Sequence, residues 1–428
     1  MFIEIIIRYL VKMKFQTVNT KLQFWQKGVV LFLMLYFTSF MSYREFTGFP
    51  RGLVFIVAYS VMALLLAKQT YLNGTTMSKT VNLVVLSFLL SCIPSILIFG
   101  QSVYDSLGGI LMFVFPMSLY YILHRWNVEE RLVFKYLMIF TAVFGFFEVI
   151  QQFTYPTYWF NGRAADEYSG LLEQRMGFWR FYLFGIGYCL LAIMLCFGKI
   201  LKKEGKTIYN YGMFIICAIA IYFFLARKDI YAVVSCIAIG TLFYSKRGGN
   251  TGSKIFIGIL LVGIYFFLSN AMVDLNAQTQ TEMGEGNEDF IRFVAADYFI
   301  NSFSDSPLYY IFGSGVPGGK NYLASQISYL IDNMHIYQDD CGFVGYFSRF
   351  GLFGVLMQII ILYKICVNYK YLDMSLLMFA LLQVEISFFD FWGNNARNLA
   401  AWAIFLYLVD KNIQKNKQIK INNGKNFR

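Results

Sequence analysis

The sequence predicts an all-α, polytopic integral membrane protein with about twelve transmembrane helices and one large external loop. Three observations predict this class: 58% of the 428 residues are hydrophobic, only 14% are charged, and the mean hydropathy is +0.54. Soluble domains carry roughly 25% charged residues. The composition therefore excludes an ordinary soluble enzyme, a disordered chain and a disulfide-rich secreted module.

Long apolar runs separated by short polar stretches mark the expected spans. They lie at 29–43, 52–67, 81–99, 107–124, 132–153, 179–198, 210–226, 229–244, 254–270, 341–363, 371–388 and 396–410. Several runs are shorter than the roughly 20 residues that a straight span requires. The short link at Ala226–Asp229 leaves two interpretations open, which are two separate helices or one long re-entrant element.

These spans divide the chain into five regions. They are a cytoplasmic or interfacial N-terminus at 1–28, nine helices at 29–270 with an external loop at 154–178, a large external loop at 271–340, three helices at 341–410 and a basic cytoplasmic tail at 411–428. Within the large loop, Phe290–Phe303 and Asn321–Tyr337 are predicted helices. A turn at Asp305–Pro307 and a glycine-rich turn at Ile311–Gly319 separate them. Loops of this length are usually functional.

Basic residues divide unequally between the two sides of the membrane. With both termini in the cytoplasm, the cytoplasmic loops are strongly basic and rich in lysine, as the positive-inside rule requires. The external segments contain two lysines, Lys228 and Lys320, but nine arginines: Arg44, Arg51, Arg163, Arg175, Arg180, Arg227, Arg292, Arg349 and Arg397. Arginine grips phosphate through a planar bidentate fork that lysine lacks. Either an anionic ligand requires these arginines, or external loops merely exclude lysine.

Cysteine and histidine usage argues against a metal or disulfide site. Seven cysteines are scattered along the chain without a CxxC pair, so we expect free, buried thiols. Only two histidines occur, His124 and His335. No metal is expected.

The segment Asp332–Gly354 carries the candidate general base. On a helix, Asp332, His335 and Asp339 would share one face, and a carboxylate beside an imidazole orients it and raises its basicity. The alternative is a surface histidine bound to neighbouring acids. The glycines that follow at short intervals are also consistent with close helix packing alone.

Four arginines are candidates for binding an anionic ligand: Arg175, Arg180, Arg227 and Arg292. Each stands at or near the external end of an apolar run or at the start of an amphipathic stretch, so the alternative is an interfacial anchor. Glu148 and Glu385 lie inside predicted spans and would pair with Arg397 or another arginine.

The order of these features resembles the Wzy-type polysaccharide polymerases and the related O-antigen ligases. LARKDIYAVV resembles the family's element in which an arginine, here Arg227, opens a span. The run from Arg292 through Pro307-Leu308 to Gly313-Ser314-Gly315 resembles a second family pattern, and Met334-His335 with the later Gly342, Gly345 and Gly351 resembles a third. Arg175-Met176-Gly177 is similar to the family's arginine before a mid-chain span. The resemblance covers about 160–360.

The resemblance implies a membrane-embedded glycosyltransferase without metal or nucleotide sugar. It would join repeat units carried on undecaprenyl diphosphate into O-antigen, capsule or a similar surface polysaccharide, at the outer face of the bacterial inner membrane. Arg227, Arg175, Arg180 and Arg292 would stabilise the leaving diphosphate, and His335 or Asp339 would deprotonate the acceptor hydroxyl. Tyr158, Trp159 and Tyr337 would stack on sugars. The partners are the lipid-linked glycan, the bilayer and a chain-length regulator, with no nucleic acid.

Three rival functions remain open at the level of the sequence. An O-antigen ligase performs the same chemistry with lipid A core as the acceptor. A lipid-linked oligosaccharide flippase or another transporter has a similar number of spans, but the largest loop of a twelve-span facilitator is usually cytoplasmic. A dolichol-type glycosyltransferase carries an acidic pair in its first external loop, where this chain has only Glu45.

Overall fold

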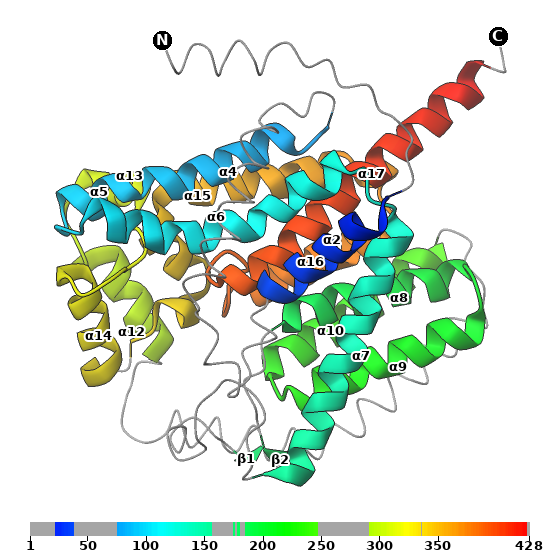
Figure 1. Ribbon diagram of the computed structural model, residues 1–428, viewed down its shortest axis with the longest axis horizontal. Helices are drawn as coiled ribbons and strands as arrows, with labels where there is room; N and C mark the ends of the chain where they lie inside the picture. The colour runs from blue at the N-terminus through cyan, green and yellow to red at the C-terminus, as the bar shows by residue number, and fades with distance from the viewer. Residues whose placement is uncertain are drawn as a thin grey trace.

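The computed structural model describes residues 22–37, 75–155, 174–175, 178–179, 185–246, 291–334 and 336–425 (Figure 1). The membrane-type helices are α2 (Phe24–Phe37), α4 (Ser78–Leu90), α5 (Cys92–Leu97), α6 (Val103–Arg125), α7 (Glu130–Thr154), α8 (Ile186–Lys202), α9 (Thr207–Phe223), α10 (Arg227–Lys246), α15 (Gly342–Val367), α16 (Met374–Ile386) and α17 (Ala396–Lys425). A short hairpin pairs β1 (Gln174–Arg175) with β2 (Phe178–Trp179). The elements before α15 are α12 (Ile291–Asp297), η3 (Tyr298–Ser302), α13 (Pro307–Phe312), α14 (Tyr322–Met334) and η4 (Gln338–Cys341), and η5 (Tyr369–Tyr371) follows it. The protein is a helical membrane protein.

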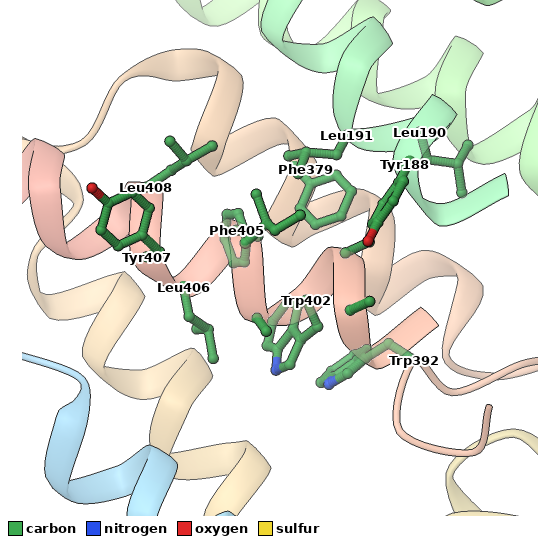
Figure 2. Packing of buried hydrophobic residues seen from close by; sticks show 14 of the residues in the cluster. Tyr188, Leu190, Leu191, Phe379, Trp392, Trp402, Phe405, Leu406, Tyr407 and Leu408 are labelled. Atoms are coloured by element: carbon green, nitrogen blue, oxygen red, sulfur yellow. The ribbon is translucent and has the colours of Figure 1, made fainter. Parts of the chain in front are cut away.

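Helix α17 lies at the centre of the helices. Every residue from Leu399 to Val409 is buried, on all sides of the helix, which is the pattern of a helix surrounded by others. It packs against α6 on one side and α8 on the other. Figure 2 shows its aromatic side chains in this core, where the ring of Phe405 lies 4.9 Å from that of Phe379.

Two groups of helices meet across α17. Helices α4, α5, α6 and α15 pack together on one side, and α7, α8, α9, α10 and α16 form the other (Figure 1). The turn between α9 and α10 answers the question that the link at Ala226–Asp229 left open. Leu225 adopts a φ of 55°, α9 ends before it and α10 begins at Arg227. The two runs are therefore separate helices.

The number of membrane spans differs from the prediction. Four stretches in the described part of the chain are long and apolar enough to cross a membrane: Ser78–Leu97, Val103–Arg125, Glu130–Thr154 and Gln338–Val367. They match four of the twelve predicted spans. Helices α2, α9 and α16 are apolar but shorter, and α10 carries Arg227, Lys228 and Asp229 in its first turn. The predicted spans at 52–67 and 254–270 lie outside the described residues.

Loops predicted to share a side of the membrane lie together in the structure. At the end predicted as cytoplasmic, Lys202 pairs with Asp373 at 2.5 Å, and the Asn416 side chain donates to the carbonyl of Tyr371 at 2.8 Å. At the opposite end, which is predicted to be external and is named the external end, Lys228 pairs with Asp390 at 2.5 Å. This separation agrees with the predicted alternation of loops in the described helices, while the identity of the cytoplasmic side remains a prediction.

A buried carboxylate joins three helices at the end predicted as cytoplasmic. Asp410 of α17 is fully buried, and its Oδ1 accepts hydrogen bonds from the backbone N–H groups of Thr76 and Met77 at 2.9 and 3.0 Å. These groups stand at the start of α4, where N–H groups lack partners within the helix. The Oδ2 atom accepts from the Tyr120 hydroxyl at 2.5 Å and lies 3.3 Å from Nε2 of His124. Asp410 thus caps α4 and holds α6 against α17.

We expect Asp410→Ala to lower the free energy of unfolding by about 3 to 5 kcal/mol, because it leaves several buried polar partners unsatisfied. Tyr120→Phe removes one hydrogen bond to the carboxylate and should lower it by about 1.5 to 3 kcal/mol. Thermal unfolding in detergent measures both.

The matched control is Asp373→Ala, which breaks the half-exposed pair with Lys202 at the same end. It should change stability by less than about 1 kcal/mol. Equal losses for Asp410→Ala and Asp373→Ala would contradict the capping role of Asp410.

Candidate functional site

The described part of the large loop that is predicted to be external has a hydrophobic core of its own. Phe299, Phe303, Tyr309, Leu323 and Leu330 are buried together, and the cluster extends to Val344 of α15. The Tyr309 hydroxyl donates to the carbonyl of Phe299 at 2.5 Å, and burial raises the pKa of this phenol. Helices α12, α13 and α14 therefore form a folded unit at one end of the molecule (Figure 1).

The glycine-rich turn of this unit docks onto an interruption of α15. Gly351 has a φ of 65° and a ψ of −175°, which breaks the helix inside its apolar run. The backbone N–H groups of Ser314 and Gly315 donate to the freed carbonyls of Ser348 and Arg349, at 2.7 and 3.0 Å. Irregular backbone at membrane depth is tolerated where protein groups satisfy it. A side chain at Gly313, whose φ is 80°, would collide with the backbone of Arg349 and Phe350.

The other face of the glycine-rich turn lies against the start of α6. The Gln101 side chain is 1% exposed, donates to the carbonyl of Val316 at 3.0 Å and accepts from the N–H of Gly318 at 3.1 Å. Gly109 of α6 lets the turn approach, because a Cβ there would lie 2.7 Å from the carbonyl oxygen of Val316. The predicted glycine-rich turn is thus confirmed, and it connects α6 with α15.

Charged side chains from several segments lie near one another beside this unit. Lys228 of α10 pairs with Asp390, in the link between α16 and α17, at 2.5 Å. Asp340 of η4 lies within electrostatic reach of both Lys228 and Arg292. The guanidinium of Arg292 also lies 5.5 Å from the centre of the Phe389 ring. The start of α10, the start of α12 and η4 therefore share one region at the external end.

A second ion pair adjoins this region. The Nη1 atom of Arg349 donates to Oδ1 of Asp339 at 2.5 Å and to the backbone carbonyl of Asn394 at 2.8 Å. Arg349 is 9% exposed, whereas the Asp339 side chain is 57% exposed. We call this group of side chains the external charged cluster. It consists of Lys228, Arg292, Asp339, Asp340, Arg349 and Asp390.

The structure locates some of the predicted site residues in this cluster. Arg292 and Asp339 belong to it. Arg227 opens α10 next to Lys228, but its side chain lies outside the described part of the structure. His335 also lies outside the described residues, between Met334 of α14 and Ile336.

The hairpin carries Arg175 in β1, and the side chain of Arg175 is not described. Arg180, Tyr158 and Trp159 lie outside the described residues. The hairpin is held by two bonds between the Gln152 side chain and the backbone of Trp179, at 2.7 and 2.9 Å. Phe178 packs against Phe223 at the end of α9. The hairpin therefore lies at the ends of α7 and α9, and the end of α9 is close in sequence to the start of α10.

The predicted common face of Asp332, His335 and Asp339 is wrong. Helix α14 ends at Met334, so Asp332 and Asp339 do not stand on one helix. The cause is Ile336, which is buried in the core of the loop and whose N–H bonds to the carbonyl of Leu330 at 3.0 Å. This contact turns the chain out of the helix.

The predicted pairing of Glu385 with an arginine also differs from the structure. Its Oε1 accepts a hydrogen bond from the Ser235 hydroxyl of α10 at 2.7 Å. Glu148 is fully buried. All seven cysteines are free thiols. Among the residues that the structure describes, no three His, Cys, Asp or Glu side chains gather in a way that could hold a metal ion.

Three further functional candidates stand out in the structure: Lys228, Asp390 and above all Arg349. A signal for Arg349 existed, because it is a charge inside the apolar run 341–363, and intramembrane charges commonly mark functional sites. No such signal marked Asp390, whose partner is 162 residues away.

No family model matches this chain, and no curated protein sequence matches it significantly.

Two adjacent glycines of α6 test how the glycine-rich turn docks. Gly109→Ala should lower the free energy of unfolding by about 1 to 3 kcal/mol, because the new methyl group overpacks against the backbone of Val316. It should also expose residues 313–319 to limited proteolysis. Thermal unfolding and protease digestion in detergent measure the two effects.

Gly108→Ala is the matched control, because a Cβ there has nothing within 4 Å. It should leave proteolysis unchanged and raise stability slightly, since alanine is the better helix former. If both variants behave alike, the turn does not dock as described.

Proposed function

We propose that this protein polymerises oligosaccharide repeat units carried on undecaprenyl diphosphate at the outer face of a bacterial inner membrane, by inverting glycosyl transfer. The order of motifs between about 160 and 360 supports this proposal. The single observation that carries it is the external charged cluster, in which Arg292, Lys228 and Arg349 each lie near a carboxylate beside a folded loop.

The proposed reaction forms one bond and breaks one. The oxygen of an acceptor sugar hydroxyl attacks the anomeric carbon of another unit, and the bond from that carbon to the diphosphate oxygen breaks. The hydroxyl proton passes to His335 or Asp339, and the lipid diphosphate leaves with the electron pair. Arginine side chains at the external end, with Arg227, Arg175, Arg180 and Arg292 as candidates, stabilise its charge.

Arg227→Lys tests the bidentate role of the guanidinium. We expect chain extension to fall at least about 100-fold, the size of effect seen when one donor to a developing anion is lost, although the charge is kept. The measurement is the rate at which a polysaccharide ladder grows in a deletion strain complemented with each variant.

Arg131→Lys supplies the control, since Arg131 is exposed at the opposite end of the molecule. It should extend chains at the wild-type rate. A wild-type ladder from Arg227→Lys would disprove the diphosphate role of Arg227.

A lipid-linked oligosaccharide flippase is the second candidate. The interruption of α15 at Gly351 favours it, because transporters build substrate sites from discontinuous helices. The two candidates differ in which glycan intermediate accumulates in a strain that lacks the protein.

Loss of a polymerase leaves single repeat units displayed on the cell surface, and this is the outcome we expect. Loss of a flippase causes lipid-linked repeat units to accumulate in the cytoplasmic leaflet of the inner membrane. Loss of an O-antigen ligase leaves lipid-linked polymer that is not transferred to lipid A core. Mass spectrometry of surface glycans and lipid-linked intermediates distinguishes the three results, and either of the last two would reject the polymerase.

A further inference from the structure

Arg349 is held in an unusual position for a charged side chain. It belongs to the first part of α15, two residues before the interruption at Gly351, and is 9% exposed. Its Nη1 atom joins two segments that are distant in sequence, the carboxylate of Asp339 and the carbonyl of Asn394. The guanidinium thus connects η4 with the link between α16 and α17.

Hydrogen bonds on either side make this connection rigid. The Gln338 side chain donates to the Ser348 hydroxyl at 2.9 Å, and that hydroxyl donates to the carbonyl of Gly345 at 2.8 Å. The Asn394 side chain donates to the carbonyl of Gly342 at 2.6 Å. A Cβ at Gly345 would collide with the carbonyl of Gln338, so the contact requires glycine. Asp339 is therefore carried on a turn that cannot slide along α15.

The carboxylate that Arg349 holds remains open to the external side. The Asp339 side chain is 57% exposed, whereas that of its partner is 11% exposed. A nearly buried cation thus fixes one oxygen of an accessible carboxylate. Such an acceptor is suited to a hydroxyl group, because an ionised carboxylate accepts hydrogen bonds on both oxygens and charge-assisted bonds are the stronger ones.

The arrangement is poorly suited to stability alone. Within the described residues, the buried Nε of Arg349, Oε1 of Gln338 and Oδ1 of Asn394 have no hydrogen-bond partner. Unpaired buried polar atoms lower stability, and they call for a reason such as a role in function. A buried ion pair is likewise weak evidence for stabilisation. These atoms lie in residues that are each more than nine-tenths buried.

We propose that Arg349 is a positioning residue, and that the Asp339 carboxylate it fixes accepts the hydrogen bond of the acceptor sugar hydroxyl. This inference rests on the proposed polymerase function and specifies its acceptor subsite. The ligand class is a neutral sugar hydroxyl, in contrast to the diphosphate expected at the arginines. Asp339 then orients the attacking oxygen, and misplacement of such a group by about 1 Å can slow a reaction about 100-fold.

The test measures chain extension in membrane vesicles that contain the host's own lipid-linked repeat units and one variant each. Asp339→Asn, Arg349→Lys and Arg349→Gln should each slow extension about 100-fold. The double variant Asp339→Asn with Arg349→Gln should be no slower than either single variant, because Arg349 acts through Asp339. Lys320→Met removes an exposed external cation outside the cluster and should extend chains normally.

Membrane levels and thermal unfolding are followed for every variant. Wild-type extension by Asp339→Asn would overturn the inference, as would a double variant about 10⁴-fold slower than wild type, which signals independent roles. Loss of folded protein in both Arg349 variants would assign the guanidinium to folding and overturn it too. If the wild-type protein itself extends no chains, it is the polymerase function that fails.

Discussion

Unpaired polar groups are costly in an apolar bundle, and this structure depends on partners that the protein itself supplies. Three places supply such partners in different ways. Asp410 caps the start of α4 from the distant α17. The N–H groups of Ser314 and Gly315 satisfy the carbonyls freed where α15 breaks. The guanidinium of Arg349 donates hydrogen bonds to the carboxylate of Asp339 and to the carbonyl of Asn394, which belong to two different segments. Each solution joins segments that are far apart in the sequence.

The two ends of the bundle use charge differently. At the end predicted as cytoplasmic, Asp410 is fully enclosed, with hydrogen bonds from the backbone and Tyr120, so it serves architecture. At the external end, Asp339 is more than half exposed although its partner is nearly buried. Lys228 and Asp390 are also partly exposed. An accessible charged group that is fixed in place by a buried partner, as Asp339 is by Arg349, is expected in a preorganised binding site.

Charge balance at the external end constrains how an anionic substrate would bind there. Within the external charged cluster, Arg349 pairs with Asp339 and Lys228 pairs with Asp390, while Asp340 lies within electrostatic reach of Arg292. A diphosphate would have to compete with these carboxylates for their cations. Exchange of one oxyanion for another avoids leaving a cation unpaired, which is the costly outcome in a poorly hydrated site. Such an exchange is suited to an anion that binds and leaves once in each catalytic cycle.

The sequence by itself determined the helical membrane class, the positions of four spans and the segregation of loops to two ends. Apolar run length and charge placement are local properties, so they can be seen without the fold. The helix predicted at Phe290–Phe303 is also seen in its described part, where α12 and the π-helix η3 cover 291–302. Only the tertiary structure decided that Ile336 turns the chain before Asp339, that Glu385 meets Ser235, and that Arg349 organises the external end. These features depend on contacts between different segments of the chain. Local sequence patterns do not predict which distant groups come into contact.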